Sequence, residues 1–138
     1  TPWLIPILDV FEEQKSRKYV KHIIDSGLLE IVPLSYMRGR TFKNTFIIAD
    51  EMQNSSPTQM KMLLTRLGEN SKMVVLGDIT QNVEIENGLK DLITRIKRYY
   101  DIESFYYDMN NDGISLVGLK EKDVQRSEIV RKILNIYE

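Results

Sequence analysis

Two short apolar runs, each leading directly into acidic residues, constrain the fold of this chain more than any other feature. The first covers residues 45–49 and continues into Asp50 and Glu51, and the second covers 72–76 and continues through a glycine into Asp78. Apolar runs of this length are typical of parallel strands that are buried on both faces of a sheet. We therefore predict two such strands, each with an acidic residue at its carboxyl end.

Amphipathic stretches surround these runs, so that helices and strands are expected to alternate along the chain. This alternation indicates an α/β fold with a mostly parallel sheet flanked by helices, and a length of 138 residues indicates a single domain over 1–138. Further strands are expected at 29–32, 102–107 and 114–118, and helices at 3–14, 16–26, 57–67, 89–100 and 127–137.

The segment after the first acidic pair carries the signals of a helix start. Ser56 suits the N-cap, Pro57 suits the first helical position, and Gln59 completes a capping box. Gly68 is expected to end the helix. The buried side of this helix is expected to consist of Met60, Leu63, Leu64 and Leu67.

Composition excludes several classes of site. Lys and Arg number 19 against 20 Asp and Glu, for a net charge of −1, so any nucleic-acid surface must be a local patch. The chain contains no cysteine and only one histidine, His22, which excludes disulfides, thiolate metal sites and His-rich metal clusters. No apolar run approaches the roughly 18 residues that span a bilayer. We expect a cytoplasmic protein with no membrane partner.

The two acidic clusters are expected to lie at one edge of the sheet, because parallel strands bind ligands beyond their carboxyl ends. Asp50 is suited to hold Mg²⁺ through a water molecule. Glu51, pointing the opposite way along the strand, is suited to polarise an attacking water. Gln81, which both donates and accepts hydrogen bonds, is suited to contact a terminal phosphate. A single acidic pair of this kind is more often merely solvated or caps a helix.

The motifs together resemble the signature region of PhoH-type ATPases, which are relatives of superfamily-one helicases with a P-loop NTPase fold. The resemblance is strongest over 36–81, which reads YMRGRTFKNTFIIADEMQNSSPTQMKMLLTRLGENSKMVVLGDITQ, and returns in LKEKDVQRSEIV at 119–130. The segments DEMQN and GDITQ correspond to the Walker B and phosphate-sensing motifs of that family.

The resemblance implies hydrolysis of ATP with Mg²⁺, coupled to RNA or single-stranded DNA. Carried over by position, Asp50 assists Mg²⁺ and Glu51 activates water. Gln81 senses the γ-phosphate, and Gln53 couples the nucleotide state to the neighbouring loop. Asp78 joins the nucleotide-binding set as the acidic residue of the sensing motif.

Three arginines are further candidates from the resemblance. Arg126 lies where the family has an arginine near the nucleotide, and a surface ion pair is the equal alternative. Arg38 and Arg40 flank Gly39 in a loop before the first strand. They are suited to contact phosphates of nucleic acid, or the nucleotide of a neighbouring subunit in a homo-oligomer, although solvated loop arginines are common.

No phosphate-binding loop is present in these 138 residues, since none of the seven glycines is followed by lysine. The resemblance therefore implies a partner, a segment or chain that bears the P-loop, and an isolated chain that is inactive. In the family the P-loop strand lies between the strands expected here at 72–76 and 102–107. These two are not expected to pair, whereas 45–49 and 72–76 are expected to pair in parallel.

Two other functions are compatible with the same residues. One is a non-catalytic module that binds nucleic acid or a protein. The other is a metal-dependent phosphoesterase with Asp50, Glu51 and Asp78 directly on Mg²⁺. The helix at 89–100 adds a cationic face that is ordinarily just solvated but is suited to form a stacking and phosphate patch; its residues are Lys90, Arg95, Lys97, Arg98, Tyr99 and Tyr100.

Overall fold

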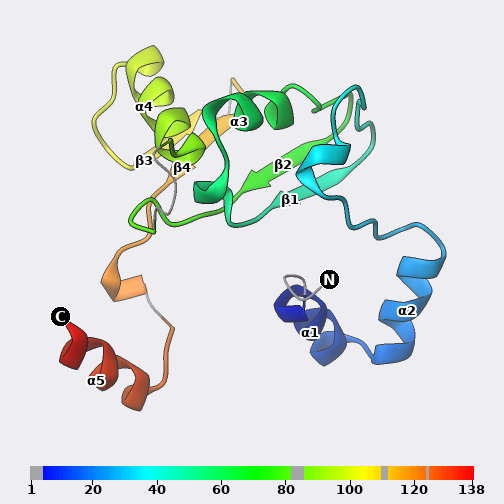
Figure 1. Ribbon diagram of the computed structural model, residues 1–138, viewed down its shortest axis with the longest axis horizontal. Coiled ribbons are helices and arrows are strands. Elements are labelled where there is room, and N and C mark those ends of the chain that lie inside the picture. Colours follow the sequence, from blue (N-terminus) through cyan, green and yellow to red (C-terminus); the bar gives the residue numbers. More distant parts are fainter. Residues whose placement is uncertain (1–4, 82–85, 110–111, 124) are drawn as a thin grey trace. The chain divides into compact units, whose positions relative to one another are not determined.

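The computed structural model describes residues 5–81, 86–109, 112–123 and 125–138, and over these residues the chain has an α/β fold. Its α-helices are α1 (Ile5–Gln14), α2 (Arg17–Asp25), α3 (Pro57–Leu64), α4 (Gly88–Tyr100) and α5 (Glu128–Tyr137) (Figure 1). Its strands are β1 (Phe46–Ala49), β2 (Lys72–Val75), β3 (Tyr106–Met109) and β4 (Ile114–Val117). Short 3₁₀ turns are η2 (Leu34–Tyr36), η3 (Met52–Asn54) and η4 (Glu121–Asp123).

The chain divides into two compact units. One comprises the chain up to Ile47 together with Lys61–Met73, and the other comprises Ile48–Met60 and Val74–Glu138. In the first unit α1 contacts α2, and Ser16 caps α2 by accepting a hydrogen bond from the Tyr19 amide at 3.1 Å. The helices predicted around these residues are confirmed where the structure describes them, while the single domain stays a prediction.

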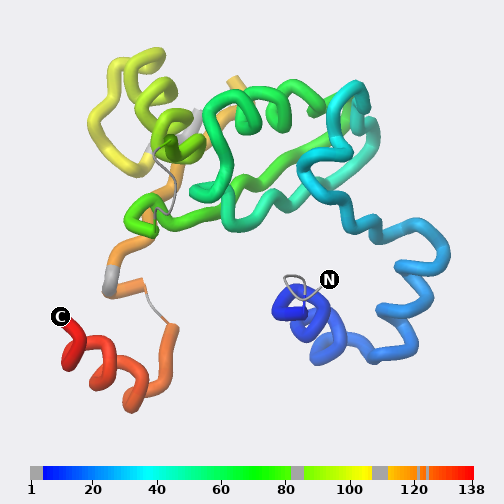
Figure 2. Tube along the Cα trace, viewed as in Figure 1, coloured from blue at the N-terminus to red at the C-terminus, as the bar shows by residue number. Residues whose placement is uncertain are grey.

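Strands β1 and β2 lie side by side and run in parallel (Figures 1 and 2). The Lys72 amide donates to the Thr45 carbonyl at 3.0 Å, and the Leu76 amide donates to the Ala49 carbonyl at 2.8 Å. Since both residue numbers rise together, the strands point the same way. The predicted parallel pairing is confirmed.

The prediction that β1 is buried on both faces is wrong. Phe46 is 62% exposed and Ile48 is 49% exposed, whereas Ala49 on the opposite face is buried. Successive side chains of a strand point to opposite faces, so one face of β1 is covered and the other is not.

Strands β3 and β4 form a separate antiparallel pair. In the register, Tyr106 lies opposite Val117 and Met109 lies opposite Ile114. Among the described residues β2 therefore pairs with β1 and not with β3, as predicted. What fills the remaining edge of β2 stays a prediction.

No strand forms at 29–32, so that prediction is wrong. The Leu29 amide instead donates to the Ile23 carbonyl at 2.9 Å, which closes the end of α2. A strand is stable only when a neighbour satisfies its backbone groups, and in the described chain no strand lies beside this segment to do so.

Helix α3 begins as its sequence predicts. The Gln59 amide donates to Ser56 Oγ at 3.1 Å, and the Ser56 amide donates to Gln59 Oε1 at 2.9 Å, which completes the capping box. Met60 and Leu63 are its most deeply buried side chains and belong to the core. This capped, buried helix directly follows the acidic segment after β1.

Helix α3 ends earlier than predicted, at Leu64. Leu67 is exposed and forms a parallel bridge with Phe42, and the Gly68 amide donates to the Phe42 carbonyl at 2.8 Å. A Cβ on Gly68 would lie 2.5 Å from that carbonyl oxygen. Gly68 therefore allows two backbone segments to approach closely rather than capping the helix.

Among the described residues, no helix is both long enough and apolar enough to cross a membrane.

Candidate active site

The two acidic segments meet where β1 and β2 end. Beyond the last strand hydrogen bond, the Met52 amide donates to the Leu76 carbonyl at 3.0 Å. The chain that leaves β1 is thus bonded to the chain that leaves β2. This places Asp50 and Asp78 at the same edge of the sheet, in the arrangement expected for ligand binding by a parallel sheet.

A tight turn, rather than the strand, sets the direction of Glu51. Strand β1 ends at Ala49, and Asp50 Oδ1 accepts a hydrogen bond from the Glu51 amide at 2.9 Å. Glu51 has a left-handed backbone with φ of 56°, which is uncommon for a residue other than glycine. The expectation that Asp50 and Glu51 alternate along a strand is therefore wrong, because the strand has already ended. Such strained turns are concentrated at functional sites.

Gln53 joins the two acidic segments from within the protein. Its Nε2 donates to Glu51 Oε2, and its Oε1 accepts from the Asp78 amide at 3.1 Å. The residue is only 1% exposed. Both ends of the amide are thus used inside the chain, and almost no surface of Gln53 is left to meet a ligand.

Gly77 provides the space that this amide needs. A Cβ at Gly77 would lie 2.6 Å from Gln53 Oε1 and 2.6 Å from Leu89 Cδ2, which is closer than real Cβ contacts. Any side chain at this position would therefore displace Gln53 or Leu89. The glycine before Asp78 is explained by this close packing.

Thr80 and Gln81 hold the Asp78 carboxylate. Oδ1 accepts from the Thr80 hydroxyl at 2.6 Å and from its amide at 2.9 Å, while Oδ2 accepts from Gln81 Nε2 at 3.2 Å. These bonds favour the ionised carboxylate, so the pKa of Asp78 lies below its ordinary value, with the Thr80 hydroxyl as the largest cause. Sequence reasoning missed Thr80, although an aspartate side chain that bonds the backbone two residues further on is a known turn signal.

Thr80→Val is expected to raise the pKa of Asp78 towards the ordinary value, because it removes the hydroxyl donor and keeps the side-chain shape. Asp78 contributes stability that is fully present above about pH 4 and is lost as the pH falls through the lowered folded value. The pKa can be followed by NMR titration of the Asp78 carboxyl carbon. In the control Thr94→Val, which removes a hydroxyl bonded to the Lys90 carbonyl, Asp78 should titrate as in the unmodified chain. An unchanged Asp78 pKa in Thr80→Val would contradict this account.

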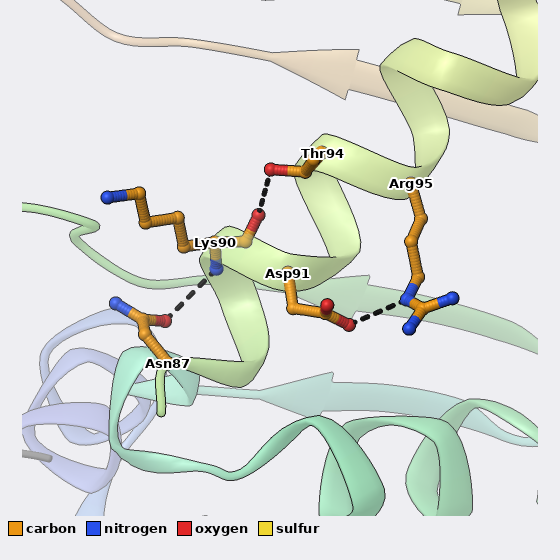
Figure 3. Close-up of polar contacts among 5 residues, drawn as sticks. All are labelled: Asn87, Lys90, Asp91, Thr94 and Arg95. Carbon is orange, nitrogen blue, oxygen red and sulfur yellow. Dashed lines mark hydrogen bonds and ion pairs between the residues drawn. The ribbon is translucent and has the colours of Figure 1, made fainter. Parts of the chain in front are cut away.

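The first residue of helix α4 is hydrogen-bonded to the segment that follows Gln53. The Gly88 amide donates to the Ser55 carbonyl at 2.7 Å, and Ser55 Oγ donates to the Met52 carbonyl at 2.6 Å. Asn87 caps the helix by accepting from the Lys90 amide at 3.0 Å (Figure 3). Sequence reasoning missed this attachment, although Asn87 before an amphipathic run is a helix start signal.

The three candidate arginines are placed differently. Arg40 donates to both carboxylate oxygens of Glu30, at 3.0 and 3.2 Å, and its guanidinium lies over the Phe42 ring. Each partner stabilises the charge of the other, so the pKa of Glu30 is lowered and that of Arg40 is raised. Arg38 and Arg126 are exposed, and the described residues give neither of them an ion pair. Arg126 is the one of the three that belongs to the same compact unit as the acidic segments, and the described residues give it no ion pair with them.

The donor atoms at the strand ends fit a magnesium ion that is only partly held by protein. Asp50 uses Oδ1 in the turn and leaves Oδ2 without a hydrogen bond from the described residues. No set of three or more potential ligands gathers around one point in that part of the chain. Mg²⁺ is commonly bound by one or two carboxylates, with phosphate oxygens and water completing its shell, and Asp50 matches this pattern.

Comparison with known proteins gives a consistent result. The family described as PhoH-like protein matches residues 1–138. A PhoH-like protein of Synechocystis is 40% identical over 141 residues, and one of Bacillus subtilis is 37% identical over 137 residues; each alignment covers 99% of this chain, but only 39% and 40% of the respective relative. Protein PhoH of Escherichia coli K12 is 34% identical, with 99% of this chain and 36% of that protein covered. The chain thus spans about two-fifths of the length of these relatives, and with its whole length matched it belongs to the PhoH family.

Proposed function

We propose that this chain supplies the Walker B and phosphate-sensing half of an ATPase that acts on RNA or single-stranded DNA. The observation that carries the proposal is the buried Gln53 amide, which joins Glu51 to the segment of Asp78 and Gln81. The base that activates water and the group that senses phosphate must act together, and the buried Gln53 side chain connects the two. Phosphoryl transfer depends mainly on such positioning and on charge stabilisation.

Each polar residue at the strand ends has a distinct role in this proposal. Asp50 would hold Mg²⁺ through a water molecule, and the bound ion would neutralise charge on the phosphates. Glu51 takes the proton of the attacking water, with its carboxylate held by Gln53. Asp78 holds Gln81 through Oδ2, so that the Gln81 amide is positioned to meet a terminal phosphate. Arg126 and Arg38 remain candidates for a contact with phosphate, whereas Arg40 is engaged by Glu30.

Two other functions are weaker candidates. A non-catalytic binding module is favoured by the lack of a Gly-Lys-Ser/Thr motif in these 138 residues. A metal-dependent phosphoesterase requires Asp50, Glu51 and Asp78 together on the ion, but the described residues contain no group of three or more side chains placed to hold a metal ion. Cleavage of a phosphodiester that is abolished by EDTA and needs no nucleotide would favour the phosphoesterase.

The 138-residue chain is expected to bind Mg-ATP with a Kd weaker than about 1 mM, which corresponds to roughly −4 kcal/mol. Acidic strand ends repel an anionic ligand, and the 138 residues contain no Gly-Lys-Ser/Thr motif whose backbone cradle would offset this repulsion. Calorimetric titration measures the affinity directly. Micromolar binding would contradict the assignment of these residues to one half of a nucleotide site.

The proposed function itself is tested in a longer protein that contains this chain together with a phosphate-binding loop. Steady-state hydrolysis of ATP that requires Mg²⁺ and increases with RNA or single-stranded DNA is the expected result. A protein that binds nucleic acid yet never hydrolyses ATP would instead support the non-catalytic module.

A further inference from the structure

One side of helix α4 carries three basic residues, Lys90, Lys97 and Arg98, which we call the α4 strip. An α-helix turns by about 100° per residue, so the three lie within a sector of about 100° around its axis. They extend over about 12 Å along the helix, which is longer than a single phosphate group and suits a chain of charges. Tyr99 is turned about 180° from Lys90 and is therefore not part of the strip.

None of the strip residues forms an ion pair within the described part of the chain. The one acidic residue of α4, Asp91, is paired with Arg95 at 2.8 Å. Figure 3 shows this pair, with the Lys90 side chain extending away from it. Among the described residues neither Lys90 nor Arg98 has an acidic partner, and Lys97 places Nζ 3.4 Å from the centroid of the Phe105 ring.

The chain as a whole has a net charge of −1, so the strip is a local concentration of positive charge rather than a general property. Lys and Arg are the residues that contact phosphates along a nucleic-acid strand, and such contacts are independent of sequence. Flexible side chains on a rigid helix suit a phosphodiester backbone, whose charges recur at regular intervals.

The same helix is attached to the candidate active site. Gly88 is bonded to Ser55 at 2.7 Å, and its Cβ position would lie 2.5 Å from the Ser56 carbonyl oxygen. One residue further, Leu89 is buried and packs where a side chain at Gly77 would stand. A ligand on α4 therefore binds an element whose first turn packs against the segments that hold Gln53.

We propose that the α4 strip binds the phosphodiester backbone of single-stranded RNA or DNA, and that α4 connects this binding to the Gln53 link. The proposal rests on the nucleic-acid-coupled function proposed above and names the surface that performs the coupling. Binding itself needs no ATP, so it can be measured separately from hydrolysis.

The test is fluorescence anisotropy of a labelled single strand of about 20 nucleotides, as RNA and as DNA, titrated with the 138-residue chain at several salt concentrations. The variant Lys90→Glu with Arg98→Glu is compared with the control Lys18→Glu with Lys21→Glu on α2. Both variants change the net charge equally and replace exposed helical cations. We expect the α4 variant to weaken binding by at least about tenfold and to lower its salt dependence, and the α2 variant to change binding by less than about threefold.

Circular dichroism of both variants confirms that each is folded, and Lys90→Gln with Arg98→Gln, which removes charge without reversing it, should show an intermediate loss. Equal weakening by the α2 and α4 variants would overturn the proposal, because general charge would then explain binding. The proposal would also be overturned if the chain bound neither the RNA nor the DNA oligonucleotide, or if it bound vesicles containing phosphatidylserine instead of nucleic acid. If the longer protein hydrolyses no ATP while nucleic-acid binding still depends on the strip, the ATPase proposal fails and the proposal for the strip stands.

Discussion

Glu51→Gln, in a longer protein that contains this chain and a phosphate-binding loop, is expected to reduce ATP turnover by about 10²- to 10⁴-fold. The carboxylate is the group asked to take a proton from water, and an amide of the same size cannot do so. Glutamine still accepts a hydrogen bond from Gln53 Nε2 through its carbonyl oxygen, so the turn after β1 should keep its structure. Nucleotide affinity should therefore stay within about threefold, because only the transition state loses an interaction.

Steady-state hydrolysis and equilibrium nucleotide titration, performed on the same preparations, separate these two effects. Glu69→Gln is the matched control, since Glu69 is exposed and its side chain is given no partner in the described part of the chain. The control should hydrolyse ATP at the unmodified rate. Turnover of Glu51→Gln within about threefold of the unmodified protein would exclude Glu51 as the base.

Gly77→Ala is expected to have the second largest effect, on turnover and on stability together. The added methyl group would lie 2.6 Å from the side-chain oxygen Oε1 of Gln53 and 3.1 Å from the backbone nitrogen of Gln53. Gln53 is buried and bonded at both ends, so it cannot move away without losing a bond to Glu51 or to Asp78. Displacement of a catalytic group by about 1 Å can cost about 10²-fold in rate, and overpacking typically costs about 1–3 kcal/mol.

The control for this substitution is Gly27→Ala, which adds the same methyl group where nothing lies within 4 Å. Gly27 has φ of 78°, so alanine there should reduce stability through backbone strain alone. Urea denaturation measures stability in both variants, and ATP hydrolysis in the longer protein measures turnover. Gly77→Ala should lose turnover and Gly27→Ala should keep it. Full turnover in Gly77→Ala would show that the Gln53 link does not position Glu51.

The sequence by itself determined the local structure and the positions of the candidate site. The capping box at Ser56 and Gln59, the stop of α2 near Gly27 and the parallel pairing of 45–49 with 72–76 were all predictable. The first two depend on contacts between residues only a few positions apart. The third depends on two apolar runs, each of which forms a strand that needs a neighbouring strand for its backbone hydrogen bonds. The motifs DEMQN and GDITQ likewise placed Asp50, Glu51, Gln53, Asp78 and Gln81 after these strands.

Only the tertiary structure decided how these residues act on one another. The hydrogen bond between Gln53 and the Asp78 amide joins residues 25 positions apart. The atoms that lie close to Gly77 and Gly88 cannot be predicted from the residues next to these glycines in the sequence. The strand expected at 29–32 failed for the same reason, because pairing depends on what lies beside a segment in space. Exposure of Phe46 and Ile48 also depends on which layers cover the sheet. Contacts a few residues apart are fixed by the local order of side chains, whereas contacts between distant segments exist only once the chain has folded.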